Sequence, residues 1–69
     1  MFGERLSQLR LAQGLSQSEL ARRSGLAPSA VNNLEHGRRW PRATTLRKLA
    51  AGLNVPPTEL LQGVTPNAV

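Results

Sequence analysis

The chain has 69 residues, no cysteine and a formal net charge of +5. A chain of this length builds one domain with one modest core, so neither a second folded unit nor an elaborate catalytic cleft is expected. Without cysteine there is no disulfide framework and no thiolate zinc site, and one histidine with four glutamates and no aspartate offers no metal-ligand cluster. We therefore expect no metal, no cofactor and no enzyme activity.

The charge arises from eight arginines and one lysine against four glutamates. Such a balance favours a polyanionic partner, although a merely solubilising basic surface has the same composition. No apolar run approaches the ~18 residues of a membrane span, and the first five residues lack the apolar segment of a signal peptide. We expect a cytoplasmic protein with no membrane partner.

Glycine, proline, serine and asparagine divide the chain into short helical pieces without strand-like alternation, which predicts an all-α fold. The expected helices cover residues 4–13, 17–23 and 28–36, a segment that ends near Gly52, and a last helix from Pro57 to before Gly63. We expect a single domain over residues 1–63 and a flexible tail over 64–69.

Several local signals set these boundaries. Phe2, Leu6 and Leu9 are expected to face inward from the first helix, and Gly14 is a fitting stop beyond its end. Ser16 and Glu19 form the pattern of a capping box, in which each side chain satisfies a free backbone N–H at the start of the second helix.

The segment from the second to the third helix has the spacing of a DNA-binding helix-turn-helix. Two helices that cross through a tight turn admit only a small residue at their contact and favour glycine in the turn, and Ala21 and Gly25 occupy these positions. Val31 and Leu34, three apart, would dock the third helix on the first two.

The opposite face of the third helix carries Pro28, Ser29, Asn32, Asn33 and His36. None of these residues is acidic, and an asparagine amide can bond the N6 and N7 atoms of adenine. Ordinary exposed polarity is the alternative explanation for the two asparagines. Within this motif DNA contact is favoured.

Over residues 4–62 the chain resembles the Cro and phage-repressor type of helix-turn-helix, the xenobiotic-response-element-like family of small bacterial and phage regulators. The matching residues are Leu15, Ser16, Gln17, Glu19, Leu20, Ala21, Gly25, Val31 to Glu35, Gly37, Arg38, Pro41, Leu46, Leu49, Ala50, Leu53, Val55, Glu59, Leu60 and Leu61. The resemblance implies a compact five-helix domain of the lambda-repressor type.

The resemblance also implies roles for individual residues. Gln17 corresponds to the family's glutamine that bonds a DNA phosphate, and the base-reading face corresponds to Pro28, Ser29, Asn32 and Asn33, of which Ser29 and Asn33 are also candidates for phosphate. The chain departs from the family where Ala27 replaces a Ser or Thr cap. Pro28 stands where a polar reader is common, so we expect it to start the helix.

Further implied roles lie outside the third helix. Arg10 and Glu35 match a structural ion pair, and Arg38, Arg39 and Arg42 fall where the family's loop approaches the DNA backbone, a solvated loop being the alternative. Trp40 is expected to pack on the domain edge or to contact a second copy. Such a dimer contact would include Val55 and Pro56.

Together these features predict a sequence-specific regulator, a repressor that binds a near-palindromic operator as a homodimer, formed in solution or only on DNA. An antitoxin with a toxin partner and a restriction-controller protein would have the same fold. A protein-interaction module that uses Trp40 and the last helix is the alternative from another functional class.

Overall fold

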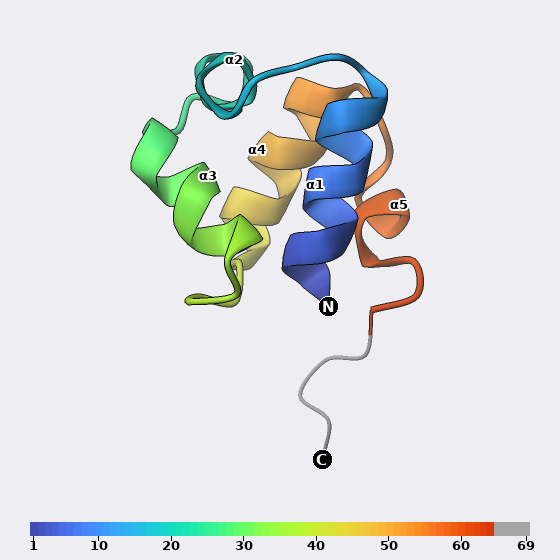
Figure 1. Ribbon diagram of the computed structural model, residues 1–69. Coiled ribbons are helices and arrows are strands. Elements are labelled where there is room, and N and C mark those ends of the chain that lie inside the picture. Colours follow the sequence, from blue (N-terminus) through green and yellow to red (C-terminus); the bar gives the residue numbers. More distant parts are fainter. Residues whose placement is uncertain (65–69) are drawn as a thin grey trace.

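The computed structural model describes residues 1–64, which form five helices and no strand (Figure 1). The helices are α1 (Phe2–Ala12), α2 (Gln17–Ser24), α3 (Pro28–Glu35), α4 (Ala43–Leu53) and α5 (Pro57–Leu61). α2 packs on α3 and α4, α1 packs on α3 and α5, and α5 also packs on α4. The all-α, five-helix expectation is confirmed. Of the predicted tail, residues 65–69 lie outside the described residues.

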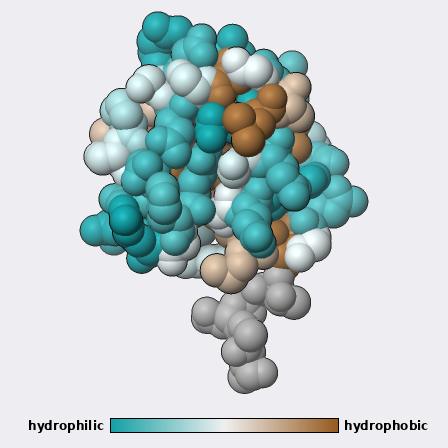
Figure 2. Space-filling view, in the orientation of Figure 1, coloured by the Kyte–Doolittle hydropathy of each residue, from teal (hydrophilic) through white to brown (hydrophobic). Residues whose placement is uncertain are grey.

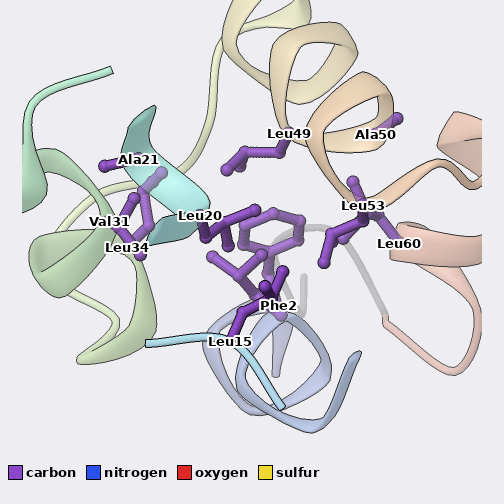
Figure 3. Packing of buried hydrophobic residues seen from close by; sticks show 11 residues of the cluster. Phe2, Leu15, Leu20, Ala21, Val31, Leu34, Leu49, Ala50, Leu53 and Leu60 are labelled. Carbon is purple, nitrogen blue, oxygen red and sulfur yellow. The ribbon is translucent and has the colours of Figure 1, made fainter. Parts of the chain in front are cut away.

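One hydrophobic core joins all five helices, and Figure 3 shows Phe2 and Leu20 near its centre, between Val31 and Leu34 on one side and Leu53 and Leu60 on the other. Its buried members are Phe2, Leu6, Leu15, Leu20, Ala21, Val31, Leu34, Leu49, Ala50, Leu53 and Leu60. Leu9, Leu26, Leu46, Val55 and Val64 are partly buried around it. The inward positions predicted from helical spacing are therefore those that pack, since each short helix gains stability mainly by burying its apolar stripe.

α1 begins at Phe2, two residues before the predicted start at position 4. The two added residues are Phe2 and Gly3, and Gly3 is buried against the end of α3. A Cβ at Gly3 would lie 2.6 Å from the carbonyl oxygen of Leu34 and would overlap that of Glu35. This glycine permits a close approach of two backbones, which the helical period alone did not reveal.

α4 continues through Gly52 to Leu53, in agreement with the predicted end near Gly52. Asn54, at φ 58°, adopts the left-handed conformation that closes the helix. Gly52 instead lies against Ser24 of α2, where a Cβ would overlap the serine hydroxyl. The glycine is a packing residue, and asparagine is the other residue that tolerates this left-handed cap.

Within residues 1–64, no helix combines the length and apolarity required to cross a membrane.

Candidate nucleic-acid interface

α2 is fixed by contacts at its own two ends. The hydroxyl of Ser16 accepts from the backbone N–H of Glu19 at 3.0 Å, and the carboxylate of Glu19 accepts from the backbone N–H of Ser16 at 2.9 Å. Gly25 follows the helix at φ 69° and closes it in the left-handed conformation. Both the predicted capping box and the predicted glycine turn are confirmed.

The capping box also perturbs Glu19. The pKa of this carboxyl is lowered, first by the hydrogen bond from the backbone N–H of Ser16 and then by the bond with its hydroxyl, with smaller help from Arg22 and Arg23. The carboxylate also lies at the positive end of the α2 dipole. The N-terminal turn of α2 is thus stabilised by a charged hydrogen-bond acceptor.

The crossing of α2 and α3 is closely packed, as the sequence predicted. Ala21 is fully buried, and its carbonyl oxygen accepts from the backbone N–H of Leu26 at 2.8 Å across the turn. Val31 and Leu34 are buried in the same core. A Cβ at Gly25 would meet open space among the described residues, so the turn requires glycine for its positive φ and not for room.

This docking leaves the opposite side of α3 at the surface. Pro28, Ser29 and His36 are exposed, and Asn32 and Asn33 are half-buried. Pro28 occupies the first turn of the helix, as expected of a helix initiator. The side that faces away from the core is therefore the neutral, polar face that the sequence predicted.

A chain of hydrogen bonds connects this face to the domain interior; we call it the Arg10–Asn32 chain. Arg10 holds Glu35 through two bonds, Nε to Oε2 at 2.6 Å and Nη2 to Oε1 at 3.1 Å. Gln17 donates through Nε2 to Oε1 of Glu35 at 2.9 Å, and Asn32 donates through Nδ2 to Oε1 of Gln17 at 3.2 Å. Arg10 also donates to the carbonyl of Leu15 at 2.7 Å.

The sequence predicted the members of the Arg10–Asn32 chain but not their connection. It placed Arg10 with Glu35 as a structural pair and treated Gln17 and Asn32 as separate DNA contacts. The side chains of Arg10 and Glu35 are only 12% and 6% exposed, so the ion pair is largely shielded from water. Because Gln17 and Asn32 belong to different helices, only the α2–α3 crossing brings their amides together.

The loop between α3 and α4 continues the polar surface with exposed arginines. Arg38, Arg39 and Arg42 all reach solvent, and Arg38 donates through Nη1 to Oδ1 of Asn33 at 3.2 Å. A shallow hollow beside α3 is lined by Ser29, Ala30, Asn33, Leu34, Arg39, Trp40, Pro41, Arg42 and Thr45. Hydrophilic residues cover most of the molecular face shown in Figure 2, including the side on which α3 lies.

Thr45 was not singled out from the sequence, where a threonine in the first turn of a helix carries no special signal. Thr45 lies in the first turn of α4 and lines the same hollow as Arg39 and Arg42. His36, by contrast, is in contact with its own helix: Nδ1 lies 2.9 Å from the carbonyl oxygen of Asn32.

Trp40 packs partly on the domain and is partly exposed to solvent. Its ring packs on Phe2 with centroids 5.9 Å apart, while 51% of the residue remains exposed. It lines an apolar hollow together with Pro41, Ala43, Leu46, Leu61 and Val64. Val55 and Pro56 follow α4, whereas Trp40 precedes it, so an 11-residue helix of roughly 16 Å separates the two parts of the predicted dimer contact.

Comparison with known proteins agrees with this geometry. A family model described as helix-turn-helix matches residues 6–60, which include α2, α3 and the turn between them. The chain belongs to the helix-turn-helix family of DNA-binding transcriptional regulators. The Cro and phage-repressor resemblance is thereby confirmed for this regulator.

Among curated proteins, the regulator is 41% identical over 61 residues to the uncharacterized HTH-type transcriptional regulator y4dJ of Sinorhizobium fredii, covering 88% of this chain and 79% of that protein. It is 39% identical over 61 residues to the uncharacterized HTH-type transcriptional regulator RghRB of Bacillus subtilis, covering 87% of this chain but only 44% of that one. The regulator thus spans less than half of some relatives that it matches.

Among solved structures, the regulator superimposes on the restriction-modification controller protein C.AhdI from Aeromonas hydrophila with a TM-score of 0.83 and 47% sequence identity. The match covers 86% of this chain and 89% of that one. The relation therefore extends over nearly the whole length of both chains.

Proposed function

We propose that two copies of this regulator bind a near-palindromic operator and repress transcription, with α3 of each copy in the major groove. Two-fold related recognition helices would read half-sites about ten base pairs apart. The proposal depends chiefly on one observation: one side of α3 is committed to the core, and the other is a polar surface that continues into three exposed arginines.

The proposed contacts divide by chemistry. Pro28, Ser29, Asn32 and Asn33 face the bases, where Pro28 offers only apolar contact, as to a thymine methyl. Gln17, Arg38, Arg39 and Arg42 contact phosphates, and Ser29 and Asn33 can serve either group. Most of the affinity would come from the phosphate contacts and most of the sequence preference from the base contacts.

Selection of binding sites from a random duplex library at near-physiological salt tests this proposal directly. The selected sites are then competed against unselected DNA. An enriched palindrome is the expected result, and its spacing gives the half-site separation. Failure to enrich any sequence, with binding that disappears as salt rises, would overturn the proposal and favour a protein-interaction module based on the Trp40 hollow.

Two substitutions separate base contacts from phosphate contacts. Asn33→Ala should relax sequence preference and leave most non-specific binding intact. Arg42→Ala should weaken binding to all sequences and reduce the slope of affinity against salt concentration by about one unit. If Asn33→Ala instead lowers affinity equally for every sequence, its assignment to the bases is wrong.

A controller role in a restriction-modification system is the second candidate, because the 47% identity to C.AhdI extends over nearly the whole chain. It requires the same operator binding and differs in the genes regulated. The adjacent genes distinguish the roles: a restriction endonuclease and a methyltransferase would favour the controller role, whereas a toxin gene would favour an antitoxin. Binding of the regulator to the promoters of those genes would then complete the assignment.

A further inference from the structure

The Arg10–Asn32 chain ends at the surface that we assign to the bases. We propose that Gln17 is a positioning residue for base selection: it orients the amide of Asn32 so that Asn32 presents a carbonyl oxygen and an N–H to adenine. This inference rests on the proposed function and assigns to Gln17 a role beyond its phosphate contact.

The orientation begins at the ion pair. The carboxylate of Glu35 can only accept hydrogen bonds, and it already takes two from Arg10. The amide group of Gln17 next to it must therefore turn its NH₂ toward Oε1 of Glu35, at 2.9 Å. Because the ion pair is nearly shielded from water, the reversed amide would place two acceptors together where water screens them weakly.

The fixed amide of Gln17 in turn orients Asn32. With its nitrogen directed at Glu35, Gln17 directs Oε1 at Asn32, and a carbonyl oxygen can only accept. Asn32 consequently turns Nδ2 toward Gln17, at 3.2 Å. The direction of every amide from the interior to the surface is thus set by the one negative group at the start.

What remains free on Asn32 is one N–H and the carbonyl oxygen. Adenine presents an acceptor, N7, and a donor, N6, in the major groove, which match this pair. Guanine presents acceptors at both N7 and O6, which the carbonyl oxygen of Asn32 cannot bond. Gln17 also retains a second N–H for a phosphate, so one residue couples the grip on the backbone to the reading of a base.

Asn33 provides a matched contrast on the same helix. Its Oδ1 accepts from Arg38 at 3.2 Å, and Arg38 is an exposed side chain of the loop. The contact thus lies at the surface, while Asn32 is linked to a shielded ion pair. The positioning effect should therefore act on the base read by Asn32 and leave the base read by Asn33 unaffected.

Gln17→Lys separates the two roles of Gln17. A lysine can donate to Glu35 and to a phosphate but cannot accept from Asn32. The experiment measures dissociation constants of the purified protein for the selected operator and all its single-base-pair variants at one salt concentration. Wild type should prefer adenine at one position by about 5- to 150-fold, and Asn32→Ala identifies that position by abolishing the preference.

At that position, Gln17→Lys should bring the adenine preference close to unity, and its affinity for the operator should fall by about the preference that is lost. Gln17→Met, which lacks both donor and acceptor, should lose the same preference and still more affinity. Combined with Asn32→Ala, Gln17→Lys should have no further effect on base preference. In the Asn33→Ala background, its effect should be the same as in wild type.

An unchanged adenine preference in Gln17→Lys and Gln17→Met would overturn the positioning role and leave the proposed function intact. The same conclusion follows if Asn32→Ala alters no base preference. If wild type enriches no operator at all, the proposed function itself fails. Thermal unfolding followed by circular dichroism verifies that each variant is folded, which is expected because Arg10 keeps both bonds to Glu35.

Discussion

α2 and α3 are equally long, at eight residues each, yet different contacts fix them. α2 has a capping box at one end, a left-handed glycine at the other and two arginines in its last turn. α3 begins after Ala27, which has no polar side chain to cap it, and contains no basic residue in its last turn. Besides the core packing of Val31 and Leu34, its position depends on Gly3 and on the Arg10–Asn32 chain.

The difference shows how α3 can be held in place while most polar groups on its outward side stay free. A helix stabilised at its own ends employs the polar side chains of those ends. α3 is anchored from its inner side, so Ser29 and its neighbours remain at the surface for a ligand. Variants that weaken each kind of anchor test this contrast.

Glu35→Ala should have the largest effect, lowering the free energy of unfolding by about 3–5 kcal/mol, because Arg10 would remain shielded from water without its charged partner. Urea unfolding measures the change. Glu59→Ala is the matched control, since its pair with Arg5 is 38% and 23% exposed and should contribute less than about 1 kcal/mol. Equal losses in the two variants would show that α3 does not depend on its ion pair.

Gly3→Ala should lower the free energy of unfolding by about 3 kcal/mol, because the new methyl group meets backbone carbonyls of α3 that cannot rotate away. Gly52→Ala is the matched substitution at the α2–α4 contact and should cost less, since it first meets the hydroxyl of Ser24. Both Gly→Ala substitutions raise the intrinsic helix propensity by the same amount.

The steric overlap that Gly52→Ala creates between α4 and α2 can be reduced by removing the hydroxyl of Ser24. Among the described residues the buried hydroxyl of Ser24 has no hydrogen-bond partner, so Ser24→Ala should be nearly neutral and should restore part of the stability lost in Gly52→Ala. Thermal melts of the two single variants and the double variant provide the comparison. A double variant less stable than Gly52→Ala alone would contradict the assigned contact.

Ser16→Ala should cost about 1 kcal/mol, because it removes the side-chain acceptor at the start of α2. Ala27→Ser makes the reverse change at α3 and should add about 0.5–1 kcal/mol where the native chain lacks a cap. Urea unfolding under identical conditions compares them. If Ala27→Ser adds nothing while Ser16→Ala is costly, the start of α3 does not depend on capping.

The pH dependence of the capping box should be the smallest effect. Because the pKa of Glu19 is lower in the folded chain, its contribution is complete above the unfolded pKa and is lost as the pH falls through the folded pKa. An NMR titration of the Glu19 carboxyl should show the lowered value, and Ser16→Ala should move it upward. An unchanged titration in that variant would contradict the cause that we assign.

Sequence reasoning was most successful where neighbouring residues decide the structure. Ser16, Glu19 and Gly25 act within one or two turns of α2, so their roles could be predicted from spacing alone. The inward positions of Val31 and Leu34 followed from the helical period. The structure places the outward residues of α3 on a polar face. Their roles as DNA contacts stay predictions.

Sequence spacing predicted less about contacts between residues that are distant in the chain. Gly3 and Gly52 proved to be close-packing residues, a role that the sequence did not reveal because a packing glycine has the same sequence signature as one at a helix end. These relations depend on which helix faces are brought together.

The sequence alone therefore determined the all-α class, the α2–turn–α3 motif and the polar character of the outward face, since each depends on local hydrogen bonds or helical period. Only the tertiary structure decided that Arg10, Glu35, Gln17 and Asn32 form one hydrogen-bond chain. Three helices and the turn before α2 contribute to this chain, and its geometry exists only once the core has fixed their crossing.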